Sequence, residues 1–295
     1  MSSLLATVRA TLRRSWNDRL FGLAAEAGFW QLLSLPSLIL GVLGVIGYFS
    51  GPLGSDNLND LLRTIDDALN KVIVPSAVQS TIRPALHRIL FGGRADVVSI
   101  GFVVSLWTGS SAMATYVNTI TIAYGQRHVR GAVRSRLVAL RLYVAFVLAM
   151  IVLLPAVALG PSHFVNVFPD AWHHAVSDVT TIAFWPVVVA VSMALLATLY
   201  HQAVPVKVPW RRTLPGAVVA VVIWIVGSTL LRLWLAFAFR STATYGPLSA
   251  PVAVLVFLYL TALAILVGAE LNAEVERRRR PPEAEGNGSG AAAPP

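Results

Sequence analysis

Apolar residues are gathered into long stretches that short polar segments separate. The six stretches cover residues 28–50, 97–122, 137–159, 179–200, 214–239 and 248–269. Each has about 20 residues or more, the length that an α-helix needs to cross roughly 30 Å of hydrocarbon. The pattern predicts an all-α polytopic membrane protein with six transmembrane helices.

The segment before the first stretch has a different periodicity. Its apolar residues recur every four positions, at Leu4, Val8, Leu12, Trp16 and Leu20. Arg9, Arg13 and Arg19 fall outside this stripe, which favours a basic amphipathic helix at the membrane interface. A helix docked onto the transmembrane bundle is the structural alternative, and the two are compatible.

Three regions follow from these patterns. Residues 1–24 are expected to form a cytoplasmic amphipathic helix, and residues 25–276 the six-span membrane domain with an external helical loop over about 52–96. Residues 277–295 begin with arginines and continue as a Pro-, Gly- and Ala-rich tail that is expected to be disordered.

Lys and Arg residues alternate between the two sides of these spans. Arginines precede the first span, fill the loop between the second and third, and follow the sixth, whereas residues 160–178 contain none. The positive-inside rule therefore places both termini in the cytoplasm of a bacterial plasma membrane. A mean hydropathy of +0.69 with only 13% charged residues agrees with a membrane protein.

The net charge of +9 leaves two kinds of anionic partner to weigh. The cations are spread along every predicted cytoplasmic edge and are not gathered on one domain, which favours anionic lipid headgroups over nucleic acid. A homo-oligomer is compatible with the sequence. Cysteine is absent, which excludes disulfides, thiolate metal sites and cysteine nucleophiles.

Several segments of the chain match a known family. They are LLSLPSLIL, SLWTGSSAMATYVNTITIAYG, VPWRRTLPGAVVAVVIW and ATYGPLSAPVAVLVFLYLTALAILVGAELNAEVE. Together they resemble the YihY/BrkB family of bacterial inner-membrane proteins, from about Leu23 to Glu276. The resemblance implies a six-span protein of a family linked to virulence, some members of which carried the older name ribonuclease BN.

Residues suited to catalysis are sparse. Metal-assisted RNA hydrolysis needs clustered ligands, but His128 and His201 stand alone on the predicted cytoplasmic side. No Gly-Lys phosphate loop occurs, which argues against ATP hydrolysis. The spacing of Asp170, His174 and Asp178 is compatible with a metal or pH-sensing face, although a solvated loop explains it as well. We therefore expect no enzyme and no catalytic, cofactor or metal site.

Charged residues within predicted spans indicate a structural or functional role, because a charge at the bilayer centre costs at least about 2.5–3.5 kcal/mol. Glu26, Arg141 and Glu270 all lie near the predicted cytoplasmic ends of spans. We expect Arg141 to pair with one or both carboxylates in an intramembrane ion cluster, either as a packing element or as a gate or headgroup site. Glu274, one turn beyond Glu270, is expected at the surface.

The second span carries small polar residues at helical spacing. The candidate substrate or lipid contacts on it are Ser105, Thr108, Ser111, Thr115 and Asn118. Such a stripe serves helix packing or a permeation path. Arg232 lies about 10 Å of helix from the outer end of the fifth span, where it either snorkels or binds an anionic group.

Two function classes remain open. One is a translocator or channel, not driven by ATP, for an anionic lipid or a small envelope-related solute. The other is a non-transporting scaffold or assembly factor of the cell envelope. A ribonuclease ranks last.

Overall fold

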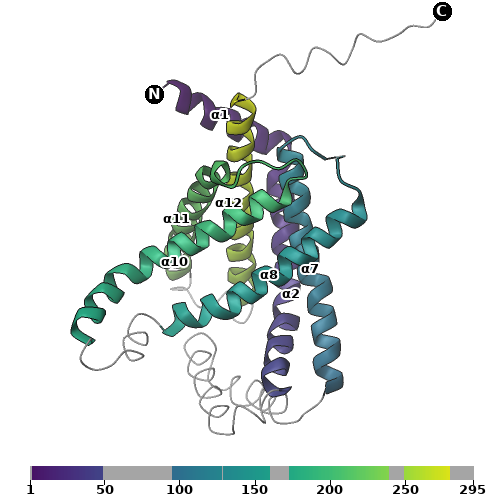
Figure 1. Cartoon of the computed structure of the whole chain (residues 1–295), viewed down its shortest axis with the longest axis vertical. Helices are drawn as coiled ribbons and strands as arrows, with labels where there is room; N and C mark the ends of the chain where they lie inside the picture. The colour runs from purple at the N-terminus through teal and green to yellow at the C-terminus, as the bar shows by residue number, and fades with distance from the viewer. Residues whose placement is uncertain (1, 49–94, 128, 160–172, 239–248, 280–295) are drawn as a thin grey trace, which may run out of the picture. The chain divides into compact units, whose positions relative to one another are not determined.

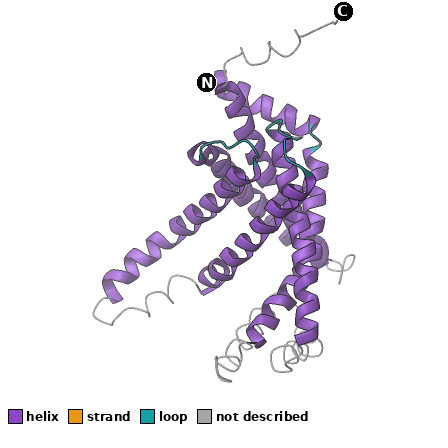
Figure 2. Cartoon of the chain, turned by 45° about the vertical axis from the view of Figure 1, so that its right-hand side comes forward, coloured by secondary structure: helices purple, strands orange, loops and turns teal. Residues whose placement is uncertain are grey.

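The computed structural model describes residues 2–48, 95–127, 129–159, 173–238 and 249–279, and every regular element within them is a helix (Figures 1 and 2). The elements are α1 (Ser2–Asn17), α2 (Leu20–Tyr48), α7 (Ala95–Ala123), α8 (Ala132–Leu159), α10 (His173–Ala203), η3 (Trp210–Thr213), α11 (Leu214–Ala238) and α12 (Ser249–Arg279). The predicted all-α fold is confirmed. Residues 52–94 of the predicted external loop and residues 280–295 of the predicted C-terminal tail lie outside the described residues.

Each predicted apolar stretch coincides with one long helix, namely α2, α7, α8, α10, α11 or α12. Among the described residues, three spans are long and apolar enough to cross a membrane: Ile182–Ala203, Trp210–Leu235 and Pro251–Arg279. The count of six spans stays a prediction. Helix α12 continues to Arg279, well past the predicted end of its span at Ala269. The residues after Ala269 are mostly polar, so they continue the helix without adding to the apolar stretch.

The chain separates into two compact units. One comprises Met1–Phe29 with Ala112–Pro295, and the other comprises Trp30–Ser111. The described part of the second unit consists of the later turns of α2, which include Pro36, and the earlier turns of α7. All the contacts between helices described below lie within the first unit.

Helix α1 ends earlier than its sequence pattern suggests. It stops at Asn17, and α2 begins at Leu20, because Arg19 adopts a left-handed backbone conformation with φ of 54°. Helix α1 docks on α12, with Thr11 and Ser15 buried. Leu12 and Trp16 stay 61% and 74% exposed, which is the arrangement expected of an interfacial helix that also contacts the bundle.

Helices α11 and α12 pack more closely than side chains would allow. A Cβ atom on Gly216 would lie 2.1 Å from the carbonyl oxygen of Gly268, and one on Gly268 would lie 2.4 Å from that of Gly216. Asn272 extends this contact, because its side chain accepts a hydrogen bond from the Gly216 amide and donates one to the Thr213 carbonyl, each at 2.8 Å. The Tyr200 hydroxyl donates to the Ile265 carbonyl at 2.7 Å and ties α10 to the same interface.

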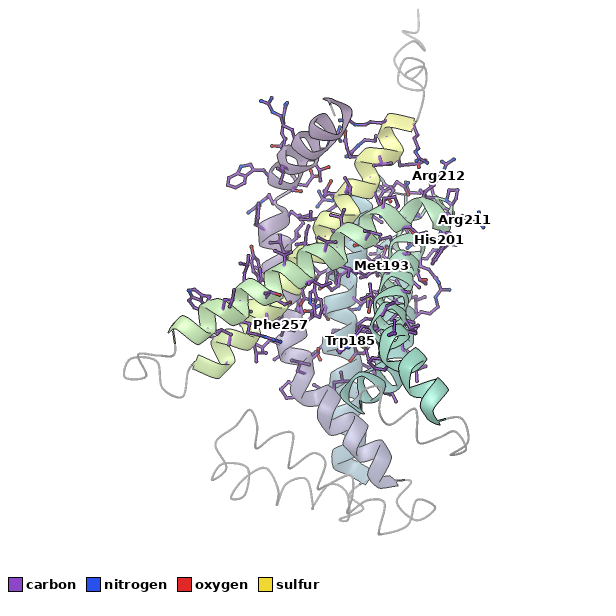
Figure 3. The ribbon with its side chains drawn as sticks, turned by 90° about the vertical axis from the view of Figure 1, so that its left-hand side faces the viewer. Trp185, Met193, His201, Arg211, Arg212 and Phe257 are labelled. Atoms are coloured by element: carbon purple, nitrogen blue, oxygen red, sulfur yellow. The ribbon has the colours of Figure 1, made fainter. Side chains whose placement is uncertain are left out.

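A short helix connects α10 to α11. Buried Thr213 ends η3 and donates its hydroxyl to the carbonyls of Trp210 and Ala197, at 2.7 and 3.0 Å. Figure 3 shows His201 near the end of α10, with Arg211 and Arg212 of η3 close to it.

Candidate functional site

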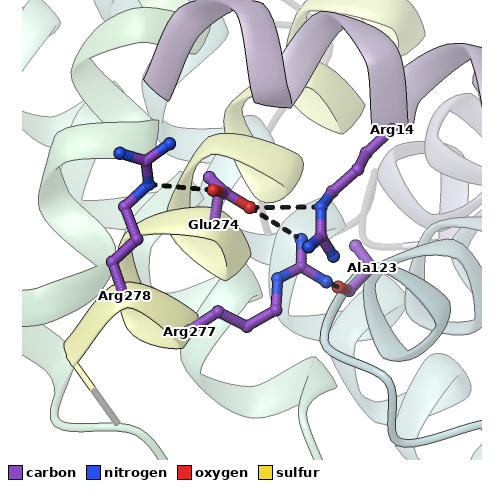
Figure 4. A network of polar contacts seen from close by, with 5 residues as sticks. All are labelled: Arg14, Ala123, Glu274, Arg277 and Arg278. Carbon is purple, nitrogen blue, oxygen red and sulfur yellow. Dashed lines mark hydrogen bonds and ion pairs between the residues drawn. The ribbon is translucent and has the colours of Figure 1, made fainter. Parts of the chain in front are cut away.

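Glu274 is the centre of an ion-pair cluster between α1 and α12 (Figure 4). Its carboxylate lies 3.2 Å from Arg14 of α1, 3.4 Å from Arg277 and 2.9 Å from Arg278. Arg277 also donates to the Ala123 carbonyl at the end of α7, at 3.2 Å. The prediction that Glu274 is a surface residue is wrong: it is only 5% exposed, because α1 covers the side of α12 that carries it. We call Arg14, Glu274, Arg277 and Arg278 the Glu274 cluster.

Glu270 lies one turn before Glu274 and is more deeply buried, at 1% exposure. No donor among the described residues meets hydrogen-bond geometry at either of its carboxylate oxygens. The charged groups that act on it are Asp18, Arg277 and Arg14. A cavity of about 500 Å³ adjoins these residues and is lined by Ala10, Arg13, Arg14, Asn17, Asp18, Ile122 and Arg277. Arg14 and Arg277 of this lining lie near Asp18, in the turn after α1, and near Glu270 and Glu274 of α12, so carboxylates offset part of the positive charge here.

The three residues of the expected intramembrane ion cluster have separate partners. Glu26 accepts a hydrogen bond from Thr115 at 3.0 Å, and Arg141 donates to the side-chain oxygen of Gln202. Among the described residues no ion pair joins Arg141 to Glu26 or to Glu270. The charges that act on Glu270 come from Asp18 in the turn after α1, from α12 itself and from α1, because α1 packs against α12.

Most hydroxyl groups of the α7 stripe bond to their own helix. Thr108 donates to the Val104 carbonyl and Ser111 to the Trp107 carbonyl, each at 2.8 Å. Thr115 instead reaches Glu26, and Asn118 is exposed at the wall of a cavity. The side chain of Ser105 lies outside the described residues. Hydroxyl groups that return to the backbone four residues earlier are typical of helix packing.

Arg232 is exposed on α11 and is surrounded by apolar side chains. Leu230, Leu233 and Trp234 beside it are 60%, 62% and 56% exposed. In the described part of the chain, Arg232 has neither a hydrogen bond nor an ion pair. Its guanidinium therefore projects from a helical face that is otherwise suited to lipid.

A second group of cations surrounds the turn between α7 and α8. We call it the turn cluster, and its members are Arg127, Arg130, Arg134, Arg136, Arg141 and Lys207. Burial and the neighbouring charges of Arg134 and Arg141 lower the pKa of Arg130. Burial, with Arg130 and Arg141, likewise lowers the pKa of Lys207. Beyond the effect of burial, repulsion between neighbouring cations contributes to both shifts.

A cavity of about 160 Å³ adjoins the turn cluster, and three members of the cluster line it: Arg127, Arg130 and Arg136. Its lining consists of Ala114, Asn118, Thr121, Gln126, Arg127, Arg130, Ala132, Ser135 and Arg136, without a carboxylate. Three hydrogen bonds hold the turn against the end of α10 and the segment after it. The Val206 amide donates to Gln126 at 2.8 Å, and Arg130 donates to the carbonyls of Ala203 and Val204 at 3.2 and 3.5 Å.

Sequence reasoning named only Asn118 and Arg141 from this region as candidate residues. The signal that predicts the turn cluster is the distribution of acids: no Asp or Glu occurs between Asp96 and Asp170, or between Asp178 and Glu270. The cations of these two segments therefore have no Asp or Glu near them in the sequence, and the structure brings several of them together.

Metal ligands do not gather in the described part of the chain, where no group of three or more His, Asp or Glu residues is placed to hold an ion. The side chains of Asp170, His174 and Asp178 lie outside the described residues.

Comparison with known proteins finds a family that matches nearly the whole chain. The family model described as virulence factor BrkB matches residues 11–293. The chain is also similar to the ribonuclease-like protein YfkH of Bacillus subtilis (strain 168), with 28% identity over 252 residues that cover 85% of this chain and 88% of that protein. No solved structure matches the chain.

Proposed function

Because the chain belongs to the virulence factor BrkB family and is an integral membrane protein, we propose that it is a translocator or channel for an anionic lipid or a small envelope-related solute. It would act in a bacterial plasma membrane, with both termini in the cytoplasm and without hydrolysing ATP. The observation that carries this proposal is the position of Arg232.

A guanidinium that has no partner among the described residues, on a helical face suited to lipid, is costly, so its presence calls for a partner or a route to water. Arg232 lies six residues before Ala238, the end of α11, which corresponds to about 9 Å of helix. A lipid phosphate supplies two oxygens that match the two parallel N–H groups of an arginine. Snorkelling to the interface alone would satisfy the charge without any transported group.

The scaffold function is the second candidate, and different observations favour it. The hydroxyl groups of Thr108 and Ser111 bond to the α7 backbone. Helices α11 and α12 meet through glycines, with no space between them at Gly216. Both features belong to a bundle that packs tightly, which an assembly factor needs as much as a transporter.

A lipid-scrambling assay tests the proposal. The purified protein in liposomes that contain fluorescent phosphatidylglycerol should speed exchange of the label between leaflets, and Arg232→Ala should slow it. Arg211→Ala is the matched control, since Arg211 is an exposed arginine near the other end of the same segment and should leave the rate unchanged. Equal rates for Arg232→Ala and the unmodified protein, or no exchange above that of empty liposomes, would favour the scaffold.

A further inference from the structure

We propose that the cavity between α7 and α8 is a binding site for a phosphate group, separate from Arg232 and independent of whether the protein translocates anything. The cavity combines three kinds of anion-binding group. These are arginines, neutral donors and the first residues of a long helix.

The arginines of the cavity come from one turn and from the start of α8. Arg127 and Arg130 lie in the turn, and Arg136 follows in α8. Arg127 is exposed and has no hydrogen bond or ion pair with another described residue. Arg130 is partly engaged, since it donates to the carbonyls of Ala203 and Val204 at the end of α10. Arg127 is therefore the residue with the most donors available to a ligand.

Neutral donors complete the lining. The side-chain oxygen of Gln126 accepts from the Val206 amide, which leaves its NH₂ group as a donor. Asn118 and Ser135 contribute an amide and a hydroxyl from the two facing helices. Ala132 begins α8, a helix of 28 residues, and the positive end of a helix dipole attracts anions.

The chemistry and the size select a compact, doubly charged oxyanion. A volume of about 160 Å³ is far too small for a lipid tail, but it accepts a tetrahedral group in place of a few waters of about 30 Å³ each. Because no carboxylate lines the cavity, an anion bound there would offset the repulsion among the neighbouring cations. A phosphate satisfies these requirements, either as free phosphate or as the headgroup of a lipid whose tails lie in the membrane.

Calorimetric titration of the full chain in detergent tests the site. The probes are inorganic phosphate, dioctanoyl phosphatidic acid, and dioctanoyl phosphatidylcholine as a zwitterionic control. We expect the protein to bind phosphatidic acid more tightly than phosphatidylcholine. Tight binding of inorganic phosphate as well would identify the free ion as sufficient, whereas binding of the lipid alone would identify a headgroup site.

Two variants with the same loss of charge separate a site from a general positive surface. Arg127→Gln should weaken binding about tenfold, because it removes charged hydrogen bonds to the ligand. Arg134→Gln removes an exposed arginine of the same cluster that does not line the cavity, and its affinity should match that of the unmodified protein. An equal loss of affinity in both variants would overturn the proposal. Failure of both inorganic phosphate and phosphatidic acid to bind would overturn it as well. Neither result depends on lipid scrambling.

Discussion

The Glu274 cluster and the turn cluster are built from the same residue type but differ in what faces the arginines. Three arginines converge on one nearly buried carboxylate in the Glu274 cluster, and Asp18 and Glu270 lie close by. The lining of the turn-cluster cavity has three arginines and no acid. The comparison suggests that matched arginines hold helices together, whereas unmatched arginines are available to a ligand from outside the chain.

The two regions also differ in packing. On the same helix as Glu274, Gly268 of α12 meets Gly216 of α11 without room for a methyl group. Beside the turn cluster, α7 and α8 leave a cavity of about 160 Å³. Changes at the first region should therefore act on stability, and changes at the second on binding.

A methyl group at the α11–α12 contact should have the largest effect on stability. Gly216→Ala places a Cβ atom against the Gly268 carbonyl and the Asn272 side chain, so the helices must separate, at a cost of about 3 kcal/mol or more. The melting temperature in detergent measures the loss. Gly227→Ala is the control, because a Cβ atom there has no neighbour within 4 Å among the described residues. Similar melting temperatures for the two variants would contradict the close packing.

Removing the central carboxylate should have the next largest effect. Glu274→Gln leaves Arg14, Arg277 and Arg278 without their counter-ion, and we expect a loss of about 2 kcal/mol, less than for a fully buried pair because the arginines are partly exposed. Glu276→Gln loses only a contact to Arg212, whose side chain is 44% exposed, and should cost less than half as much. Equal midpoints of chemical unfolding would place Glu274 outside the interactions that hold the fold.

The sequence predicts these two regions unequally. The long apolar stretches predict α2, α7, α8, α10, α11 and α12, because an apolar stretch of about 20 residues or more is typical of a helix that crosses a membrane. The apolar pattern does not predict that Glu274 is buried, because its burial depends on how α1 docks. The buried residues of α1 include Thr11 and Ser15, which are polar and lie outside the apolar stripe. The sequence does not predict the hydrogen bond between Arg141 and Gln202 either, because the two residues are 61 positions apart and lie on different helices.

Salt should affect the two clusters in opposite directions. Screening weakens the attraction around Glu274 and also the repulsion within the turn cluster. In the Glu274→Gln variant mainly the repulsion remains, so raising NaCl from about 0.05 M to 0.5 M should increase its stability relative to the unmodified protein, by about 0.5 kcal/mol. Unfolding by denaturant at the two salt concentrations measures the change. A larger stabilisation of the unmodified protein by salt would contradict the attraction assigned to Glu274 and its arginines.

The smallest predicted effect is a pH dependence from Lys207. Its folded pKa is lowered, so folding disfavours its charged form. The unfolded lysine binds the proton more tightly, and stability should rise as pH increases from the lowered folded pKa toward the unfolded value of about 10.4. Lys207→Gln should flatten this rise and add a little stability at neutral pH. An identical pH profile for the variant and the unmodified protein would show that the pKa of Lys207 is not lowered in the folded state.

One thermal experiment compares the two clusters in a single readout, the change in melting temperature when dioctanoyl phosphatidic acid is added. Glu274→Gln should melt earlier than the unmodified protein but keep its full ligand-induced increase. Arg127→Gln should melt as the unmodified protein does and lose most of that increase. If Arg127→Gln keeps the full increase, or Glu274→Gln loses it, the division between arginines that hold the fold and arginines that bind a ligand is contradicted.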